Sequence, residues 1–364
     1  MKKKVLTALI CLVTCLTCFA CGKMGALISD KTESAPKEVA SSSSADLPLG
    51  NNEEQPSFPL NANGDPYSLA GYVGYIELGS YPQTIAHHKA VAAMSQTTDS
   101  TGYYYSTWDN EHYAKISKSK VYGKRFKFSE DSLIAENETY YFKVEPIKWW
   151  VFFSGDMVGA AEGTVTLISE QILDSHYFCE EYSLDIISQD YFRNDNPNVL
   201  ANNWAYSDLR TWLNDDFLKK AFSLEDERLL VSRTTSFVAT GTNDPSPTER
   251  VWVPSNLEIT AYRGLFDALS SSLQSHYATY LSKVSDYARC RNTFISIYPD
   301  YYGCGRYWTS SAGNNSYRAS FAACDNHDKS GTAGESVGSS YMGVRPVICL
   351  YADDMTALLK DVEE

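Results

Sequence analysis

The sequence predicts an α+β fold led by strands, with short helices inserted between them. Short runs of β-branched and aromatic residues occur near both ends of residues 71–352, separated by Gly, Asn, Ser and Asp. Helical spacing and helix-capping residues lie between those runs. This order of strands, helices and strands indicates that the last strands complete the sheet that the first strands begin.

The strands before the helical region are expected at three places. Tyr72–Leu78 predicts a strand that ends in a turn at Gly79–Pro82. Trp149–Phe153 and Thr164–Ser169 are apolar and rich in β-forming residues, and a glycine-containing connection joins them. We therefore expect these two runs to be neighbouring strands of the core.

The middle of the chain predicts short helices. Leu209, Trp212 and Leu213 have the i, i+3, i+4 spacing of an amphipathic helix. Capping signals follow at Ser223–Asp226 and Ser255–Glu258. In the second signal, the serine hydroxyl can accept from the N3 amide while the glutamate reaches back to the serine amide.

The closing segment, Arg306–Leu350, predicts three strands separated by polar loops. Gly343–Leu350 is expected to be a central strand, because its last four residues are too apolar for an exposed edge. Arg345 is expected to be a buried structural clamp, paired with a carboxylate or with backbone carbonyls. Large indoles on strand or helix positions belong in a core, which predicts structural roles for Trp149, Trp212 and Trp308.

The first residues predict export and a lipid anchor. Residues 1–20 combine a basic start with an uncharged run shorter than the roughly 20 residues of a membrane span, which is typical of a signal peptide. Ala20 before Cys21 resembles a bacterial lipobox, so Cys21 is the predicted lipidation site. Its lipid would hold the protein on the outer face of a bacterial membrane. The alternative is an ordinary secreted protein with an unmodified Cys21.

Composition divides the rest of the chain. Residues 21–70 are rich in Ser, Pro and Asn and predict a disordered tether, residues 71–352 a globular domain, and residues 353–364 an acidic tail. The formal charge is −14, and it becomes −17 when the three signal-peptide lysines are removed. Such an acidic chain excludes nucleic acid as a partner, and its charge favours solubility.

The motifs point to binding more than to catalysis. The sequence contains no G-x-S-x-G, phosphate-binding loop or H-E-x-x-H motif. No cofactor is predicted, although Asp325–Asp328 gathers oxygen ligands that could hold Ca²⁺. Scaffolded polar loops often carry binding residues, which makes the loops of residues 311–342 the candidate ligand site. Its candidate residues are Asn314, Asn315, Tyr317, Arg318, Asp325, Asn326, His327 and Asp328.

Several segments resemble a bacterial family known as domain of unknown function 6273. They are Leu78–Thr84, Tyr140–Trp149, Leu209–Asn214, Arg289–Arg291, Tyr307–Ser311 and Gly343–Val347. The closing segment is also similar to the C-type-lectin-like fold of formylglycine-generating enzymes and of retroelement-diversified binding proteins. That resemblance implies a C-type-lectin-like core whose closing loops line a binding face. It implies no copper site here, because Cys304 and Cys324 are far apart in sequence.

These observations lead to one functional hypothesis and two alternatives. The hypothesis is a surface-displayed lipoprotein that acts as a non-catalytic binding module for an extracellular glycan or protein. The first alternative is an enzyme of the formylglycine-generating type, or a glycan-processing enzyme with paired carboxylates. The second is a structural component of the envelope without a small ligand.

Replacement of Cys21 tests the predicted anchor. Cys21→Ala removes the acceptor of the lipid, so the variant should move from the membrane fraction to the soluble fraction when the cells are fractionated. The wild-type chain, fractionated in parallel, is the control. A variant that stays as membrane-bound as the wild type would show that Cys21 carries no anchor.

Overall fold

The computed structural model describes residues 75–118, 120, 127–154, 158–235, 246–268, 280–322, 324 and 334–360. They all belong to the second of two units into which the chain divides, residues 54–364. The predicted signal peptide, Cys21, the predicted tether and Asp325–Asp328 lie outside the described residues. Among the described residues, no helix is long and apolar enough to cross a membrane.

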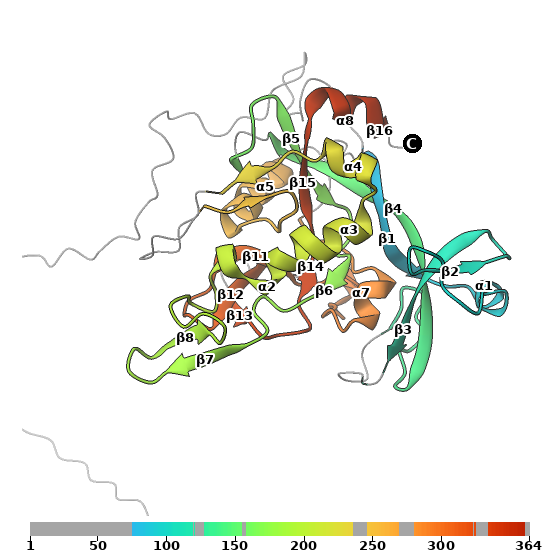
Figure 1. Ribbon diagram of the computed structural model, residues 1–364, viewed down its shortest axis with the longest axis horizontal. Coiled ribbons are helices and arrows are strands. Elements are labelled where there is room, and N and C mark those ends of the chain that lie inside the picture. Colours follow the sequence, from blue (N-terminus) through green and yellow to red (C-terminus); the bar gives the residue numbers. More distant parts are fainter. Residues whose placement is uncertain are drawn as a thin grey trace, which may run out of the picture. The chain divides into compact units, whose positions relative to one another are not determined.

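The larger sheet in the described part of the chain has seven strands (Figure 1). Its main path runs β15-β5-β4-β1-β16, while β3 pairs with both β4 and β2, and every pair is antiparallel. The seven strands are β1 (Tyr75–Ile85), β2 (Tyr104–Ser106), β3 (Glu111–Lys118), β4 (Glu138–Ser154), β5 (Thr164–Ser169), β15 (Val347–Tyr351) and β16 (Leu359–Lys360). The pairing of β4 with β5 confirms the two neighbouring core strands.

A second sheet of five described strands has the order β13-β12-β11-β14-β6. Two separate hairpins are formed by β7 with β8 and by β9 with β10. The strands of the second sheet are β6 (Asp174–Ser175), β11 (Tyr307–Ala312), β12 (Arg318–Ala322), β13 (Gly334–Ser336) and β14 (Gly343–Val344). Those of the hairpins are β7 (Tyr182–Asp185), β8 (Asp190–Arg193), β9 (Arg233–Thr234) and β10 (Thr248–Glu249).

The helices are short, and most begin at a capping side chain. Ser207 caps α2, and the capping boxes predicted at Ser223–Asp226 and Ser255–Glu258 are both present. The helices are α1 (His88–Ala92), α2 (Asp208–Trp212), α3 (Leu218–Ala221), α4 (Leu224–Leu229), α5 (Asn256–Ala268), α7 (Asp286–Cys290) and α8 (Ala352–Leu358). The single turns are 3-10 turns η2 (Trp204–Tyr206) and η4 (Pro299–Tyr301) and a π turn, η3 (Leu213–Phe217). The β-led α+β prediction is confirmed.

The core joins both sheets to these helices. The indoles of Trp149, Trp252 and Trp308 are fully buried. Trp149 Nε1 donates to the carbonyl of Leu78 at 2.8 Å, so its polar atom is satisfied inside the core. Trp212, which the sequence also assigned to the core, is only half-buried and stacks on His176 with 4.7 Å between ring centroids.

The predicted turn at Gly79–Pro82 is wrong. Strand β1 continues through it to Ile85, and the register against β4 shifts between Glu77 and Ser80. Gly79 has a φ of +67°, a conformation that suits glycine and permits a bulge within a continuous strand. A Cβ at this position would also collide with the Ala221 carbonyl and the Phe222 ring.

The prediction of one central strand at Gly343–Leu350 is also wrong. Strand β14 pairs with β11 and β6 in the smaller sheet, whereas β15 pairs with β5 at the end of the larger one. Pro346 lies between the two strands, where its missing N–H cannot serve a ladder. The free edge of β15 is covered, because Val231 and Trp252 make backbone hydrogen bonds to Cys349 and Val347. That cover explains how so apolar a strand can end a sheet.

Arg345 holds the chain where it passes between the sheets. Its side chain is buried, and the residue is 1% exposed. Nε donates to the carbonyl of Ser169 at 2.9 Å, and Nη1 donates to the carbonyl of Tyr280 at 3.3 Å. The guanidinium also lies over the Tyr307 ring, 5.5 Å from its centroid. The sequence predicted either a carboxylate or backbone carbonyls as partners of Arg345, and these hydrogen bonds go to backbone carbonyls.

Residues 353–360, which were expected to belong to an acidic tail, are folded instead. Residues 352–360 form α8 and β16, and Met355 of α8 is buried. Strand β16 pairs with the start of β1, where Tyr75 faces Lys360, and Lys360 forms an ion pair with Glu77. Apolar residues alternating with the acids, such as Met355 and Leu358, supply the packing that a solvated tail would lack.

Replacement of Arg345 tests its structural role. Arg345→Ala leaves the buried Ser169 carbonyl without its Arg345 donor, while the Tyr280 carbonyl keeps the Tyr307 hydroxyl. The lost side chain also leaves a cavity, so the free energy of unfolding should fall by roughly 2–5 kcal/mol. Asn314→Ala, in an exposed loop, should change it by less than about 0.5 kcal/mol. Chemical denaturation of both variants measures the difference. If the two variants are equally stable, Arg345 is not a structural clamp.

Candidate functional site

The sequence-predicted ligand residues divide into exposed and half-buried positions. Asn314 and Asn315 are exposed in the turn between β11 and β12, while Tyr317 and Arg318 are half-buried at the start of β12. The turn is held by Asn202, whose Nδ2 donates to the carbonyls of Asn315 and Arg318 at 2.9 and 3.0 Å. The other four candidates, Asp325, Asn326, His327 and Asp328, lie outside the described residues.

Two tyrosines that the sequence analysis missed extend this group. The ring of Tyr317 lies 4.9 Å from that of Tyr191, which lies 5.8 Å from that of Tyr182. The Tyr182 hydroxyl is hydrogen-bonded to Ser336 Oγ at 2.8 Å, and the Tyr191 amide donates to Ser316 Oγ at 2.8 Å. We call Tyr182, Tyr191, Tyr317 and Arg318 the tyrosine face. A hairpin pattern could have indicated it, because the turn formers Asp185, Ser188 and Asp190 lie between Tyr182 and Tyr191.

The β7–β8 hairpin presents apolar side chains at its tip. It extends away from the neighbouring strands (Figure 1), and Leu184, Ile186 and Ile187 are 41%, 78% and 95% exposed. Asp185 Oδ1 accepts from the Ile187 amide at 3.1 Å, and Oδ2 accepts from Ser188 Oγ at 2.9 Å. These hydrogen bonds, the Ser188 bond above all, lower the pKa of Asp185. The turn that displays the isoleucines is therefore preformed.

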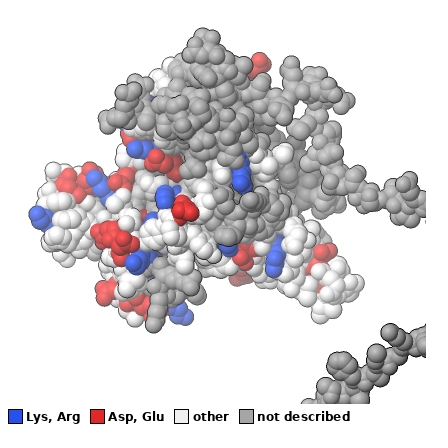
Figure 2. All heavy atoms as spheres, turned by 180° about the vertical axis from the view of Figure 1, so that it is seen from behind, with Lys and Arg blue, Asp and Glu red and all other residues white. Residues whose placement is uncertain are grey.

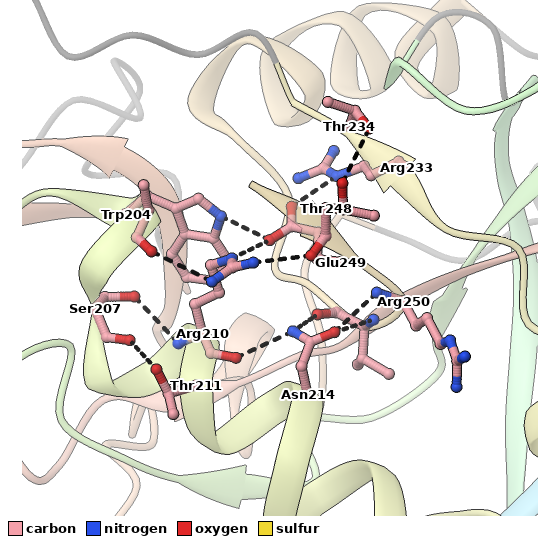
Figure 3. Close-up of polar contacts among 12 residues, drawn as sticks. Trp204, Ser207, Arg210, Thr211, Asn214, Arg233, Thr234, Thr248, Glu249 and Arg250 are labelled. Carbon is pink, nitrogen blue, oxygen red and sulfur yellow. Dashed lines mark hydrogen bonds and ion pairs between the residues drawn. The ribbon is translucent and has the colours of Figure 1, made fainter. Parts of the chain in front are cut away.

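A buried charge network around Glu249 is a different kind of cluster (Figure 3). Glu249 is fully buried, and its carboxylate accepts from Arg233 Nε at 2.8 Å, Trp204 Nε1 at 3.0 Å and Arg210 Nε at 3.1 Å. Arg233 also pairs with Glu258 at 3.0 Å. Two arginines thus face two carboxylates, and the balanced charges indicate a structural role.

Asn214 extends the same network to the chain after β10. Its Oδ1 accepts from the amides of Arg250 and Val251 at 2.8 and 3.2 Å, and its Nδ2 donates to the Val251 carbonyl at 2.7 Å (Figure 3). Arg210 donates to the Thr248 carbonyl at 2.8 Å. The polar residues of the Leu209–Asn214 segment therefore fasten the helix to residues 248–251.

A second buried carboxylate, Asp174 on β6, joins segments that are far apart in sequence. Its Oδ2 accepts from the Tyr81 hydroxyl at 2.5 Å, and its Oδ1 lies 2.5 Å from Arg291 Nε. The Ser175 amide also donates to Oδ1, at 2.7 Å. Strand β6 pairs with β14, so Asp174 connects β1, the end of α7 and the closing segment. We call Asp174, Tyr81 and Arg291 the Asp174 junction.

Two cations lie near this carboxylate, and a third lies beside Arg291. Arg291 touches Asp174, and its side chain is 41% exposed. The exposed Lys220 of α3 lies over the rings of Tyr81 and Tyr287, with Nζ 5.0 and 5.3 Å from their centroids. Lys118 of β3 donates to the Cys290 carbonyl at 2.6 Å. This cluster could not be predicted from the sequence, because its members are spread from residue 81 to residue 291.

The described residues offer few groups that could bind a metal ion or react as a thiolate. There, no group of three or more His, Cys, Asp or Glu side chains could hold a metal ion. Cys179, Cys290, Cys304 and Cys349 are buried free thiols, and Cys324 is also buried. Burial raises the pKa of the Cys179 and Cys349 thiols to about 11 and that of Cys290 to about 12. These thiols stay protonated near neutral pH, which makes them poor metal ligands.

Comparison with known proteins places the chain in a family. A family model described as domain of unknown function 6273 matches residues 162–352. This span is more than half of the 364 residues, so the chain belongs to that family. The match begins after β4, which leaves the segments at Leu78–Thr84 and Tyr140–Trp149 outside it. No curated protein and no solved structure matches the chain.

Proposed function

We propose that this chain is an exported lipoprotein, anchored through Cys21 on the outer face of a bacterial membrane, that binds another protein without catalysing a reaction. The observation that carries the proposal is the β7–β8 hairpin, whose preformed turn displays Ile186 and Ile187 to solvent. Clustered exposed apolar side chains of this kind are typical of protein-binding surfaces. The predicted tether would let the domain reach a partner beyond the membrane surface.

The tyrosine face supports the same proposal. It lies beside the hairpin, because Tyr182 and Tyr191 belong to β7 and β8 themselves. Tyrosine is enriched at interfaces because its ring offers contact area at low entropic cost and its hydroxyl can form hydrogen bonds. The exposed amides of Asn314 and Asn315 border the face and could supply polar contacts at its rim.

The charge of the hairpin indicates the chemistry of the partner. Glu180, Glu181, Asp185 and Asp190 lie on or next to its strands, and its one arginine, Arg193, pairs with Asp195 and Asp208. A partner with an apolar socket and a basic rim would complement such a tip. Elsewhere, acidic and basic side chains are interspersed over the described part of the face seen in Figure 2, which suits solubility.

A glycan is the second candidate ligand. The observation that favours it is the tyrosine face itself, since aromatic rings beside amides and an arginine can stack on sugar rings and bind their hydroxyls. The resemblance of the closing segment to C-type-lectin-like folds points the same way. The enzyme alternative of the formylglycine-generating type has less support, because the buried thiols have raised pKa values.

Site-specific photo-crosslinking tests the proposed function. A photoreactive phenylalanine analogue replaces Ile187 in the full-length protein, produced in its own cells. The matched control carries the analogue at Leu224, which is 76% exposed on α4. We expect one protein adduct from position 187 and none from position 224, and Ile187→Ser should abolish binding of that protein in a pull-down. Because position 187 is exposed, Ile187→Ser should change the free energy of unfolding by less than about 0.5 kcal/mol.

Two results would contradict the proposal that the hairpin binds a protein. If position 187 gives no adduct beyond that of position 224, the hairpin is not a protein-binding tip. If the purified protein instead binds a glycan array, and Tyr317→Ala removes that binding while Ile187→Ser does not, the glycan candidate replaces it.

A further inference from the structure

The cations around the Asp174 junction outnumber the acids. Lys118, Lys220 and Arg291 contribute three positive charges, and Asp174 contributes one negative charge. Asp174 and Arg291 are the charged groups that affect the pKa of Lys220. Burial lowers the pKa of Lys118, the Cys290 thiol acts in the opposite direction, and Arg291 lowers it further. The nearby carboxylate of Asp286 lies against Arg289, with 3.9 Å between Oδ1 and Nε. Lys220, Arg291 and Asp174 together carry a net charge of +1, and Lys118 beside Arg291 adds a second positive charge, within a chain of net charge −14.

Two of these cations have donors that face solvent. Lys220 is exposed, and its one hydrogen bond to a described residue is a long contact of 3.4 Å to the Tyr287 hydroxyl. Arg291 uses Nε for Asp174, while Nη2 makes a marginal 3.5 Å contact with the Ser175 carbonyl. Desolvation by the surrounding groups lowers the pKa of Lys220, and the field of Asp174 offsets this only in part. An external anion would supply the missing counter-charge.

The site is also held in place. Tyr81 and Tyr287 meet edge to face with 5.7 Å between ring centroids, and both are buried. Burial, and then Asp174, raises the pKa of Tyr81 well above its ordinary value, so its hydroxyl remains a donor to Asp174. The ion pair with Asp174 in turn holds the Arg291 guanidinium in place. The Arg291 guanidinium is therefore held in position without a ligand, which reduces the entropic cost of binding one. The Lys220 ammonium lies over the two tyrosine rings.

A local departure from helical geometry places Lys220 in this cluster. The π turn η3 separates α2 from α3, with Leu213 and Phe217 buried on its inner side. One residue advances an α-helix by about 100°, so a turn with one residue fewer would rotate Lys220 away from the Tyr81 ring. Such π turns are frequent at functional sites.

We infer that Lys220 and Arg291 form a binding site for a phosphate group. The planar guanidinium and the lysine ammonium are the side chains that bind phosphate in proteins. A phosphate group carries about −1.5 to −2 charges at pH 7, which matches the local surplus. A carboxylate group carries one negative charge and would leave part of the surplus uncompensated. The site lies apart in sequence from the tyrosine face and does not depend on the proposed protein partner.

Calorimetric titration tests the site on the purified full-length protein in a non-ionic detergent. Inorganic phosphate, added at constant ionic strength, should bind at one saturable site. Lys220→Met should weaken this binding by about tenfold or more, because one charge-assisted hydrogen bond is lost. Lys220→Arg should restore most of it. The matched control is Lys219→Met, since Lys219 is the neighbouring lysine and pairs with Asp215 instead. That control should bind phosphate as the wild type does.

Titrations with two other ligands identify the source of the phosphate, and a melting experiment gives a test that does not depend on the variants. Acetate should bind at least about tenfold more weakly than phosphate. Glycerol 3-phosphate that binds more tightly than inorganic phosphate would assign the site to a phosphate ester, and the reverse order would assign it to free phosphate. The melting temperature of the wild type should rise with phosphate, whether or not Lys220→Met folds.

Three results would overturn the inference. The first is no saturable binding of phosphate by the wild type at concentrations up to about 10 mM. The second is an equal loss of affinity in Lys219→Met and Lys220→Met. The third is acetate binding as tightly as phosphate.

Discussion

The buried carboxylate of Asp174 is the interaction on which the arrangement of the domain depends. Its two oxygens take a hydroxyl from β1, a guanidinium from the end of α7 and the amide of its own neighbour. The strand that carries it has only two residues and could not hold its place through backbone pairing alone. A buried charge requires complete pairing, so β1, α7 and the closing segment are brought to one point.

Two of the buried carboxylates, Glu249 and Asp174, show how charge balance separates structure from binding. The buried Glu249 and the half-buried Glu258 face two arginines, and the charges cancel. Asp174 faces cations whose outer donors reach solvent, and a positive surplus remains. The first arrangement fastens α2 to the residues after β10, whereas the second can still attract an anion. The apolar hairpin tip and the tyrosine face add a third kind of surface, mainly apolar and aromatic, that suits a protein or a glycan.

Local patterns in the sequence predicted much of the fold but little of the sites. Strands β4 and β5 and the capping boxes at Ser223 and Ser255 depend on neighbouring residues, and they were predicted. The bulge at Gly79 and the break at Pro346 depend on partner strands distant in sequence, so a turn and a single strand were predicted there instead. Tyr317 and Arg318 were candidates because they belong to the polar loops of residues 311–342. Asp174 and Lys220 were missed because only the tertiary structure brings them together.

Native-state hydrogen exchange tests the role of the Asp174 junction most directly. The amides of Leu173, Ser175 and His176 donate to the Val344 carbonyl, the Asp174 carboxylate and the Met342 carbonyl. If the junction holds the domain together, these amides exchange only when the whole domain unfolds, with the free energy that denaturant unfolding gives. Exchange of these three amides at a clearly lower free energy than the amides between β4 and β5 would contradict the account, since β6 would then open by itself.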